Sequence, residues 1–215
     1  MAEKLEKMTD FFANRIDIYD EQMLSYCKNG YIKLAETIPD NAKFLLDLGC
    51  GTGLELVEIF KRNPKIKVTG IDLTKEMLDK LNERFGNKNI DLINADYFEY
   101  DFGANVYDVA ISFETLHHFM PVDKIKLYEK IFNGLSANGK YIECDYMVIK
   151  QEEEDFCFAE NKRLRKENAI KDGEFYHYDT PCTVNNQIIM LKKAGFKNVK
   201  EVWREESTTI ITAEK

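Results

Sequence analysis

The sequence predicts an α/β fold built on a doubly wound, mostly parallel sheet of seven strands. Short runs rich in Val, Ile and Leu alternate with amphipathic segments from residue 44 onward, and strands that are separated by helices pair in parallel. The runs are apolar on both faces, as is typical of strands that helices cover on both sides. A glycine-rich turn also follows the first run, at the point where such sheets bind ligands.

Length and composition indicate a single domain over residues 1–215. With 44% hydrophobic and 32% charged residues, the chain can bury a sizeable core, and no linker divides it. The formal net charge of −8 argues against a large surface for phosphate backbones. We therefore expect a small-molecule partner rather than a nucleic acid, with the protein acting as a monomer or a homodimer.

Cysteine content and apolar runs bear on the location of the protein. Five cysteines, an odd number without a Cys-x-x-Cys pair, suggest neither a disulfide framework nor a zinc knuckle. The N-terminal residues mix both charges, and no run approaches the roughly 18 apolar residues of a membrane span. These observations favour a cytoplasmic protein with reduced thiols, no membrane contact and no bound metal.

The elements are expected in the following order. Apolar residues recur at intervals of three and four over residues 1–38, which predicts helices until Pro39 breaks the pattern. A core of alternating strands and helices should occupy 40–149, beginning with a strand from Phe44 that ends on Gly49. Further strands are expected at 67–72, 90–95, 107–113 and 139–146, with helices at 53–63, 75–85 and 121–136.

A long insertion should follow the fifth strand, over residues 150–182. Its charged part, 151–169, permits a helix, and a loop with an aromatic cluster follows at 173–181. Because ordinary connections between strands and helices take about 2–6 residues, we expect this insertion to lie on the substrate side and to close over the acceptor.

The last segment, 183–215, should complete the sheet. Thr183 is expected to cap a helix that stops at Gly195. The two final strands, 198–204 and 207–213, are too close in sequence for a helical crossover, so they should pair antiparallel.

The turn after the first strand has the sequence Asp47-Leu-Gly-Cys-Gly-Thr-Gly. Its glycines let the backbone approach a ligand, while Leu54 replaces the third small residue of a dinucleotide fingerprint. Asp72, at the end of the second strand, can accept hydrogen bonds from both hydroxyls of a ribose. Together with Asp96 after the third strand, these acids indicate a cationic nucleoside ligand. The alternative is a tight turn without a ligand, in which Asp72 caps a helix.

These motifs resemble those of class I S-adenosylmethionine-dependent methyltransferases. The resemblance covers residues 40–149 and includes Gly70-Ile-Asp, Ala95-Asp and Tyr107-Asp-Val-Ala-Ile-Ser-Phe-Glu-Thr-Leu-His-His. It implies a Rossmann-like sheet with an antiparallel C-terminal strand, S-adenosyl-L-methionine as cofactor and S-adenosyl-L-homocysteine as product. It also implies that the helical segment 1–38 covers the cofactor and the acceptor.

The resemblance also implies cofactor-binding residues. The methionine moiety would lie near Asp47, Gly49, Gly51, Gly53, Ser112 and Phe113, the ribose near Asp72, and the adenine near Leu73, Asp96 and Tyr97. The acceptor is not implied, because the family methylates small molecules, proteins, RNA and DNA on one scaffold. No Asn-Pro-Pro-Tyr motif follows the fourth strand, which argues against an exocyclic base amine as acceptor.

We therefore expect methyl transfer by in-line displacement to an oxygen, nitrogen or sulfur atom of a small molecule. An RNA or protein methyltransferase and a non-catalytic cofactor-binding protein are the alternatives. A histidine with an ordinary pKa is the usual proton acceptor near neutral pH. The candidate bases are His117, His118 and His177, and the candidate acceptor-side residues are Arg15, Tyr19, Tyr146 and Tyr178. For each of these residues, packing within the core is the competing interpretation.

Overall fold

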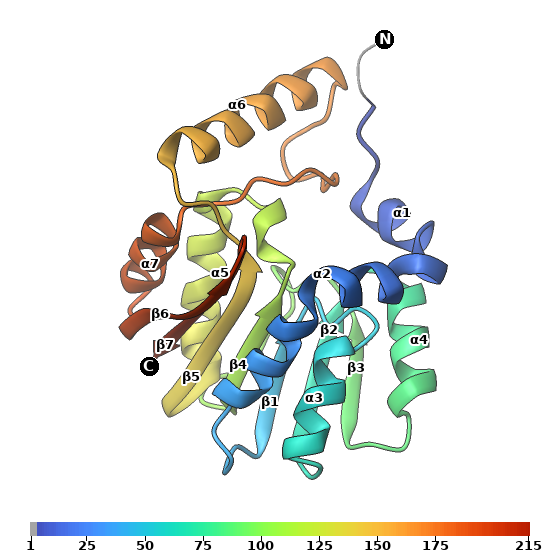
Figure 1. Ribbon diagram of the computed structural model, residues 1–215, viewed down its shortest axis with the longest axis vertical. Coiled ribbons are helices and arrows are strands. Elements are labelled where there is room, and N and C mark those ends of the chain that lie inside the picture. Colours follow the sequence, from blue (N-terminus) through green and yellow to red (C-terminus); the bar gives the residue numbers. More distant parts are fainter. Residues whose placement is uncertain (1–3) are drawn as a thin grey trace.

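A computed structural model describes residues 4–215 of the chain, so the first three residues of the expected 1–38 segment lie outside the described residues (Figure 1). One sheet runs in the order β3-β2-β1-β4-β5-β7-β6. All neighbours pair in parallel except β7, which is antiparallel to both β5 and β6. The strands are β1 Phe44–Leu48, β2 Lys67–Asp72, β3 Ile90–Asn94, β4 Tyr107–Phe113, β5 Leu135–Tyr146, β6 Lys197–Glu205 and β7 Thr208–Glu214.

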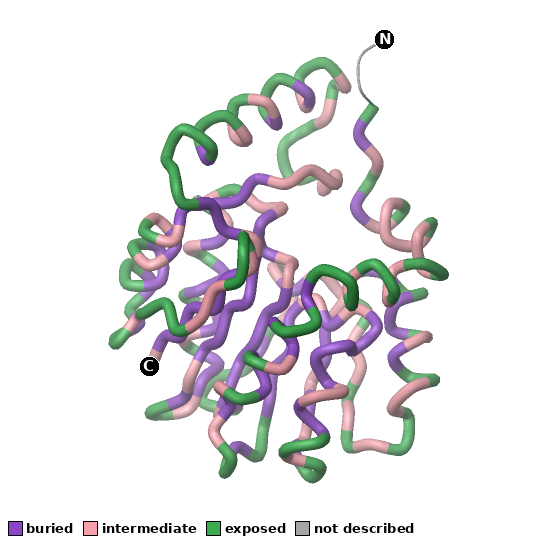
Figure 2. The backbone as a smooth tube through the Cα atoms, viewed as in Figure 1, coloured by how far each residue is buried: buried purple, intermediate pink, exposed green. Residues whose placement is uncertain are grey.

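Helices cover both faces of this sheet, which confirms the predicted doubly wound fold (Figure 1). Three helices pack on one face, α2 (Ile16–Thr37), α3 (Leu54–Arg62) and α4 (Lys75–Phe85), and two on the other, α5 (Pro121–Gly134) and α7 (Val184–Lys193). Buried residues follow the strands and the inner helix faces, and exposed residues follow the outer faces (Figure 2). No helix within residues 4–215 is long and apolar enough to cross a membrane.

Two further helices, α1 (Met8–Ala13) and α6 (Gln151–Glu167), lie beyond the carboxyl ends of the strands (Figure 1). A short 3-10 helix, η1 (Leu116–His118), follows β4 on the same side. The N-terminal segment and the long insertion thus lie on the ligand side of the sheet.

The predicted elements agree with the structure within a few residues, with one clear difference at the helix predicted over 121–136. The helix ends at Gly134, and Leu135 already pairs with Tyr107, so β5 begins four residues earlier than expected. The register between β4 and β5 then shifts, which a hydrophobic pattern does not reveal. Thr183 caps α7 as expected, because its hydroxyl accepts a hydrogen bond from Asn186 N at 3.2 Å.

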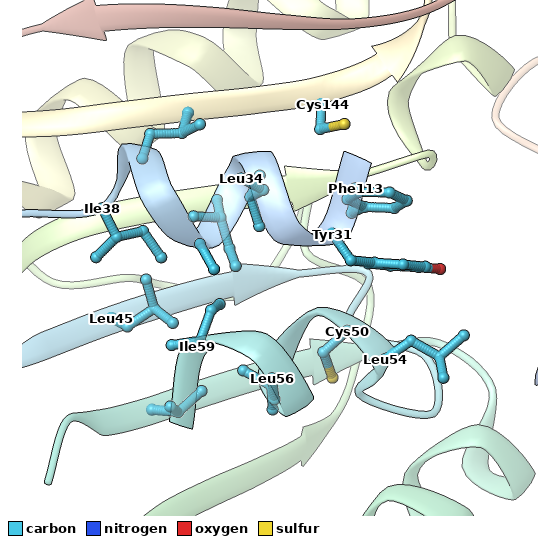
Figure 3. Packing of buried hydrophobic residues seen from close by; sticks show 14 of the residues in the cluster. Tyr31, Leu34, Ile38, Leu45, Cys50, Leu54, Leu56, Ile59, Phe113 and Cys144 are labelled. Carbon is cyan, nitrogen blue, oxygen red and sulfur yellow. The ribbon is translucent and has the colours of Figure 1, made fainter. Parts of the chain in front are cut away.

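The packing of α2 fixes one wall of the ligand side (Figure 3). The Tyr31 ring stacks on Phe113, the last residue of β4, with ring centroids 4.0 Å apart and planes 15° apart. Leu34, one turn further along α2, is fully buried against the sheet. Tyr19, near the start of the same helix, is held over the glycine turn, where its hydroxyl would lie 3.7 Å from a Cβ at Gly51.

Leu34→Ala should therefore destabilise the fold by about 2–5 kcal/mol, because truncation leaves a cavity between α2 and the sheet. Thermal unfolding measures the effect as a melting temperature lower by several degrees. The matched control is Leu24→Ala on the same helix, where the side chain is 44% exposed and the change should stay within about 0.5 kcal/mol. Equal melting temperatures for the two variants would contradict the packing described.

Candidate active site

The glycine turn lies between β1 and α3, beside the point where the strand order reverses. The amides of Gly49 and Cys50 both donate to Ile71 O, at 2.8 and 3.2 Å, which draws the turn against β2. Gly49 and Gly51 have φ values of 69° and 48°, in the left-handed region that favours glycine. A Cβ at Gly49 would lie 2.6 Å from Thr115 Oγ1, so the close approach of the turn to β4 requires glycine.

A cleft opens over this turn. Seven residues expected at the cofactor line it, namely Gly49, Gly51, Asp72, Leu73, Asp96, Tyr97 and Phe113. Met8 and Phe12 of α1 and Phe175 of the insertion complete its wall and leave a volume of about 70 Å³. Sites for small molecules usually measure roughly 300–1,000 Å³. The cleft is thus narrow where these two segments cover it.

Asp72 is held in a fixed orientation beside the cleft. One carboxylate oxygen accepts from Gly51 N at 2.9 Å and the other from Thr74 N at 2.8 Å. Burial raises the pKa of Asp72 to about 6, although these backbone hydrogen bonds oppose the rise. A carboxylate has about four acceptor positions, so both oxygens retain capacity for ribose hydroxyls. The competing interpretation of Asp72 as a helix cap accounts only for the bond to Thr74 N.

The expected adenine side is also formed by backbone and side-chain contacts. Asp96 accepts from Phe98 N at 2.8 Å, and the Tyr97 hydroxyl lies 3.1 Å from Thr115 Oγ1. Leu73 is 38% exposed and lies in the cleft wall between them. These positions are compatible with the roles that the resemblance implied.

Three expected cofactor residues do not line the cleft. Ser112 is buried on the other side of β4, where its hydroxyl lies 2.7 Å from Tyr141 Oη. Gly53 precedes α3 and packs against Leu81. Asp47 is buried beneath the turn. Ser112 and Phe113 point to opposite faces of β4, because successive strand residues alternate, and the side chain of Phe113 is the one that lines the cleft.

Asp47 nevertheless bears on the ligand. Neither of its carboxylate oxygens has a hydrogen-bond partner within residues 4–215, and Oε1 of the buried Glu55 is also without one. Burial, with the charge of Asp72 nearby, raises the pKa of Asp47 to about 7, and burial raises the pKa of Glu55 as well. Burial thus favours the neutral form of both carboxyl groups, and a cationic ligand nearby would favour their charged form.

A second, wider cavity of about 1,070 Å³ adjoins the cleft. Four residues line both cavities, namely Phe12, Tyr19, Glu114 and His118. A bridge between two distant segments roofs the boundary, because Met8 N donates to Phe175 O at 3.1 Å and His177 N donates to Glu6 O at 3.0 Å. A molecule in the wide cavity would thus lie directly beside one in the cleft.

The three candidate histidines come together in the wall of the wide cavity. Ring centroids are 4.0 Å apart for His117 and His118, and 4.8 Å apart for His118 and His177. His177 also stacks on Phe11. His117 Nδ1 lies 2.5 Å from Oδ1 of Asp145, at the end of β5.

The three histidines differ in their pKa values and therefore in their protonation. Burial would lower the pKa of His117, but the Asp145 carboxylate, with two further acids nearby, raises it to about 9. Burial and the neighbouring His117 lower the pKa of His118, and burial lowers that of His177 to about 4. At neutral pH one imidazolium therefore lies beside two neutral imidazoles.

Three of the four expected acceptor-side residues line the wide cavity. Arg15 and Tyr146 line the wide cavity, as does Tyr19, but the Arg15 guanidinium already pairs with Glu6 at 2.8 Å. Tyr178 is half-buried and is not among the residues that line either cavity.

Two acids in the wall of the wide cavity were not among the candidates. Glu114 follows β4 in a left-handed conformation, φ 47°, and burial raises its pKa to about 7. Asp179 faces all three histidines. Sequence offered only their positions, after the fourth strand and within the aromatic cluster.

Asp47→Asn should remove a pH-dependent cost of folding. The pKa of this carboxyl group rises from its ordinary 3.8 to about 7 on folding, so the native state loses stability as pH rises through that interval. Without cofactor, the variant should gain melting temperature over the wild type between about pH 5 and about pH 8, corresponding to about 1–3 kcal/mol. Thermal scans at both pH values measure it. Asp40→Asn, at an exposed aspartate, should show no such gain. An equal gain in both variants would contradict the idea that ionisation of the buried Asp47 destabilises the fold.

Comparisons with known proteins agree with this geometry. Residues 45–139 match the sequence model of the methyltransferase domain family. The carboxy-S-adenosyl-L-methionine synthase of Campylobacter lari is 28% identical over 220 residues, covering 93% of this chain and 92% of that protein.

Solved structures share the fold at low sequence identity. A provisionally assigned O-methyltransferase from Nostoc punctiforme superposes with a TM-score of 0.75 at 20% identity, covering 100% of this chain and 63% of that one. Human N-acetylserotonin methyltransferase in complex with S-adenosylmethionine gives 0.66 at 18% identity, covering 89% and 52%. The matched domain over residues 45–139, the sheet order and the structural neighbours show the fold of class I S-adenosylmethionine-dependent methyltransferases, in an enzyme that uses S-adenosyl-L-methionine.

Proposed function

We propose that this enzyme transfers the methyl group of S-adenosylmethionine to an oxygen, nitrogen or sulfur atom of a small molecule. The observation that carries the proposal is the shared wall of the two cavities, formed by Phe12, Tyr19, Glu114 and His118. A cofactor in the cleft and an acceptor in the wide cavity would meet at these four residues, as an in-line displacement requires.

The chemistry of the cofactor determines which steps the protein has to assist. S-Adenosylmethionine supplies a methyl group that a sulfonium already activates, so the protein mainly has to orient the acceptor and take up its proton. Orientation alone can contribute about 7–11 kcal/mol. The aromatic rings of Phe12 and Tyr19 form a packing surface for the acceptor at the shared wall. The buried carboxyl of Glu114 and the imidazole of His118 can accept a proton.

A small acceptor fits better than RNA or protein. The wide cavity is lined by Phe11 and Phe12 of α1 and by His177 of the insertion, and its volume of about 1,070 Å³ is just above the usual range for small-molecule sites. Glu114 and Asp179 line it, which would repel a phosphate backbone. The five cysteines are free, so we include a reducing, cytosolic location in the proposal.

A second candidate is the synthesis of carboxy-S-adenosyl-L-methionine, which the name of the Campylobacter lari protein states for that protein. Similarity along nearly the whole chain favours it. However, the carboxylate of such a product needs a cationic partner, and within residues 4–215 no lysine or arginine lines the cleft. Arg15 and Lys28 line the adjoining cavity, where Arg15 pairs with Glu6, and the His117 imidazolium lies in the same wall. The lining of the cleft therefore favours methyl transfer, whereas the adjoining cavity offers cations that a carboxylate could use.

Asp72→Ala should weaken S-adenosylmethionine binding at least tenfold while the fold persists. Charge-assisted hydrogen bonds from two ribose hydroxyls are worth about 1.5–3 kcal/mol each. Titration calorimetry measures the affinity, and the matched control is Asp91→Ala, an exposed acid on the neighbouring β3 whose loss should not change it. Unchanged affinity in a folded Asp72→Ala protein would contradict the ribose assignment.

The two candidate reactions differ in the fate of the cofactor. Incubation with S-adenosylmethionine and a panel of small hydroxyl, amine and thiol acceptors should yield S-adenosylhomocysteine and a methylated acceptor in equal amounts by mass spectrometry. Asp72→Ala serves as the cofactor-deficient control. A parallel incubation supplies S-adenosylmethionine with a panel of small carboxylic acids as carboxyl donors. A cofactor that gains a carboxylate there, with no methylated acceptor in the first incubation, would instead establish the second candidate.

A further inference from the structure

A single carboxylate oxygen in the wall of the wide cavity faces three histidines. Asp179 Oδ1 lies 3.2 Å from His118 Nδ1, 3.6 Å from His117 Nε2 and 3.9 Å from His177 Nε2. Two of these ligand-type side chains come from η1 and two from the insertion, more than 55 residues later in the sequence. Such convergence from separate segments requires contacts that hold the segments together.

Those contacts are well defined. Thr180 N and Thr180 Oγ1 both donate to His117 O, at 2.6 and 2.9 Å, and Thr180 is buried. His177 N donates to Glu6 O, which ties the other end of the aromatic loop to the N-terminal segment. The cluster is therefore a built part of the fold rather than a chance meeting of surface side chains.

Two atoms in the cluster are buried without a hydrogen-bond partner within residues 4–215, His118 Nδ1 and Asp179 Oδ1. They lie 3.2 Å apart, within the range of an ion pair. The His118 side chain is only 5% exposed, whereas that of Asp179 is 46% exposed. Because buried polar atoms are nearly always partnered, two ligand atoms that face one another without such a hydrogen bond are placed to share a third atom.

His117 has the support that metal-binding histidines usually have. Its Nδ1 lies 2.5 Å from Asp145 Oδ1, which leaves Nε2 to face Asp179. Asp145 is itself fixed, because its Oδ2 accepts from Leu116 N at 3.0 Å. A carboxylate that holds the far nitrogen of an imidazole orients the ring and increases its basicity as a ligand.

We propose that His117, His118 and Asp179 bind one divalent transition-metal ion of the zinc or cobalt type. Ligand atoms at about 2.1 Å from a tetrahedral ion lie about 3.4 Å from one another, and the Asp179 oxygen lies 3.2 and 3.6 Å from the two histidine nitrogens. All three ligand atoms lie within 4.8 Å of one another. Imidazole nitrogens with one carboxylate suit zinc, iron and cobalt better than magnesium or calcium.

Three protein ligands leave a coordination position open, as in catalytic rather than structural metal sites. All three line the wide cavity, so the open position adjoins the space assigned to the acceptor. A hydroxyl or thiol bound there would lose its proton to solvent or to a neighbouring group more readily. This role, unlike the binding of the ion, rests on the proposed methyl transfer, and it narrows the acceptor class to oxygen and sulfur.

The test measures metal binding by the full chain without cofactor or acceptor. After chelation and removal of the chelator, titration with Co²⁺ should give one equivalent with visible ligand-field absorption, and Zn²⁺ should displace it. Asp179→Asn should weaken Co²⁺ binding at least tenfold, and Asp145→Asn by about 10–100-fold through His117. The matched control is Asp172→Asn, an exposed acid of the same insertion, which should bind as the wild type does.

Circular dichroism establishes that each variant is folded, and His118→Ala provides a second ligand variant should Asp179→Asn fail to fold. Absence of Co²⁺ and Zn²⁺ binding by the wild type would overturn the proposal, as would unchanged affinity in both ligand variants. Thiolate charge-transfer absorption would also overturn it, because the ion would then occupy a cysteine site. Co²⁺ binding can be measured even if the protein transfers no methyl group, so metal binding and methyl transfer are tested separately.

Discussion

Carboxyl groups buried at the carboxyl ends of the parallel strands are the constraint on which the site depends. Removing such a group from water favours its neutral form unless hydrogen bonds or a cation compensate. Glu143 in β5 is compensated, because the Tyr128 hydroxyl donates to it at 2.9 Å and Gln187 Nε2 donates to its other oxygen. Asp47 has no such partner. The first acid stabilises the packing of α5 and α7, whereas burial of the second raises its pKa to about 7 and so favours its neutral form.

Seven of the residues expected at the cofactor line one cleft, because that side is built from short-range features. The glycine turn and the acid at the end of β2 lie within a single strand-turn-helix unit and its neighbour, and parallel strands bring their ends to one edge. Ser112 is one of the expected residues whose side chain does not line the cleft. Strand alternation alone assigns Ser112 and Phe113 to opposite faces, so only one of them could have faced the cofactor.

The acceptor side could not be predicted in the same way. The positions of His177 and Asp179 depend on the two hydrogen bonds from Thr180 to His117 O and on the pairing of residues 6–8 with 175–177. Neither contact has a periodic signal, since both join loop backbone to distant segments. The three histidines could be listed as candidates from sequence, but their convergence on one oxygen is a property of tertiary structure alone.

The same contacts couple the site to the cover over it. Asp179 and His177 belong to the insertion, whereas His117 and His118 belong to the sheet core, so whatever binds among them stabilises the closed arrangement. The cleft, by contrast, is narrow where Met8, Phe12 and Phe175 line it, so any outward movement of these residues would widen the path for the cofactor. A ligand in the histidine cluster that stabilises contact between the insertion and the core would slow or weaken exchange of a cofactor that needs these parts to separate. By linkage, separation of the two parts would in turn weaken binding of the ligand in the cluster. Occupancy of the histidine cluster should therefore hold the cofactor in place during transfer, and release of the cofactor product should require that the cover separate from the core.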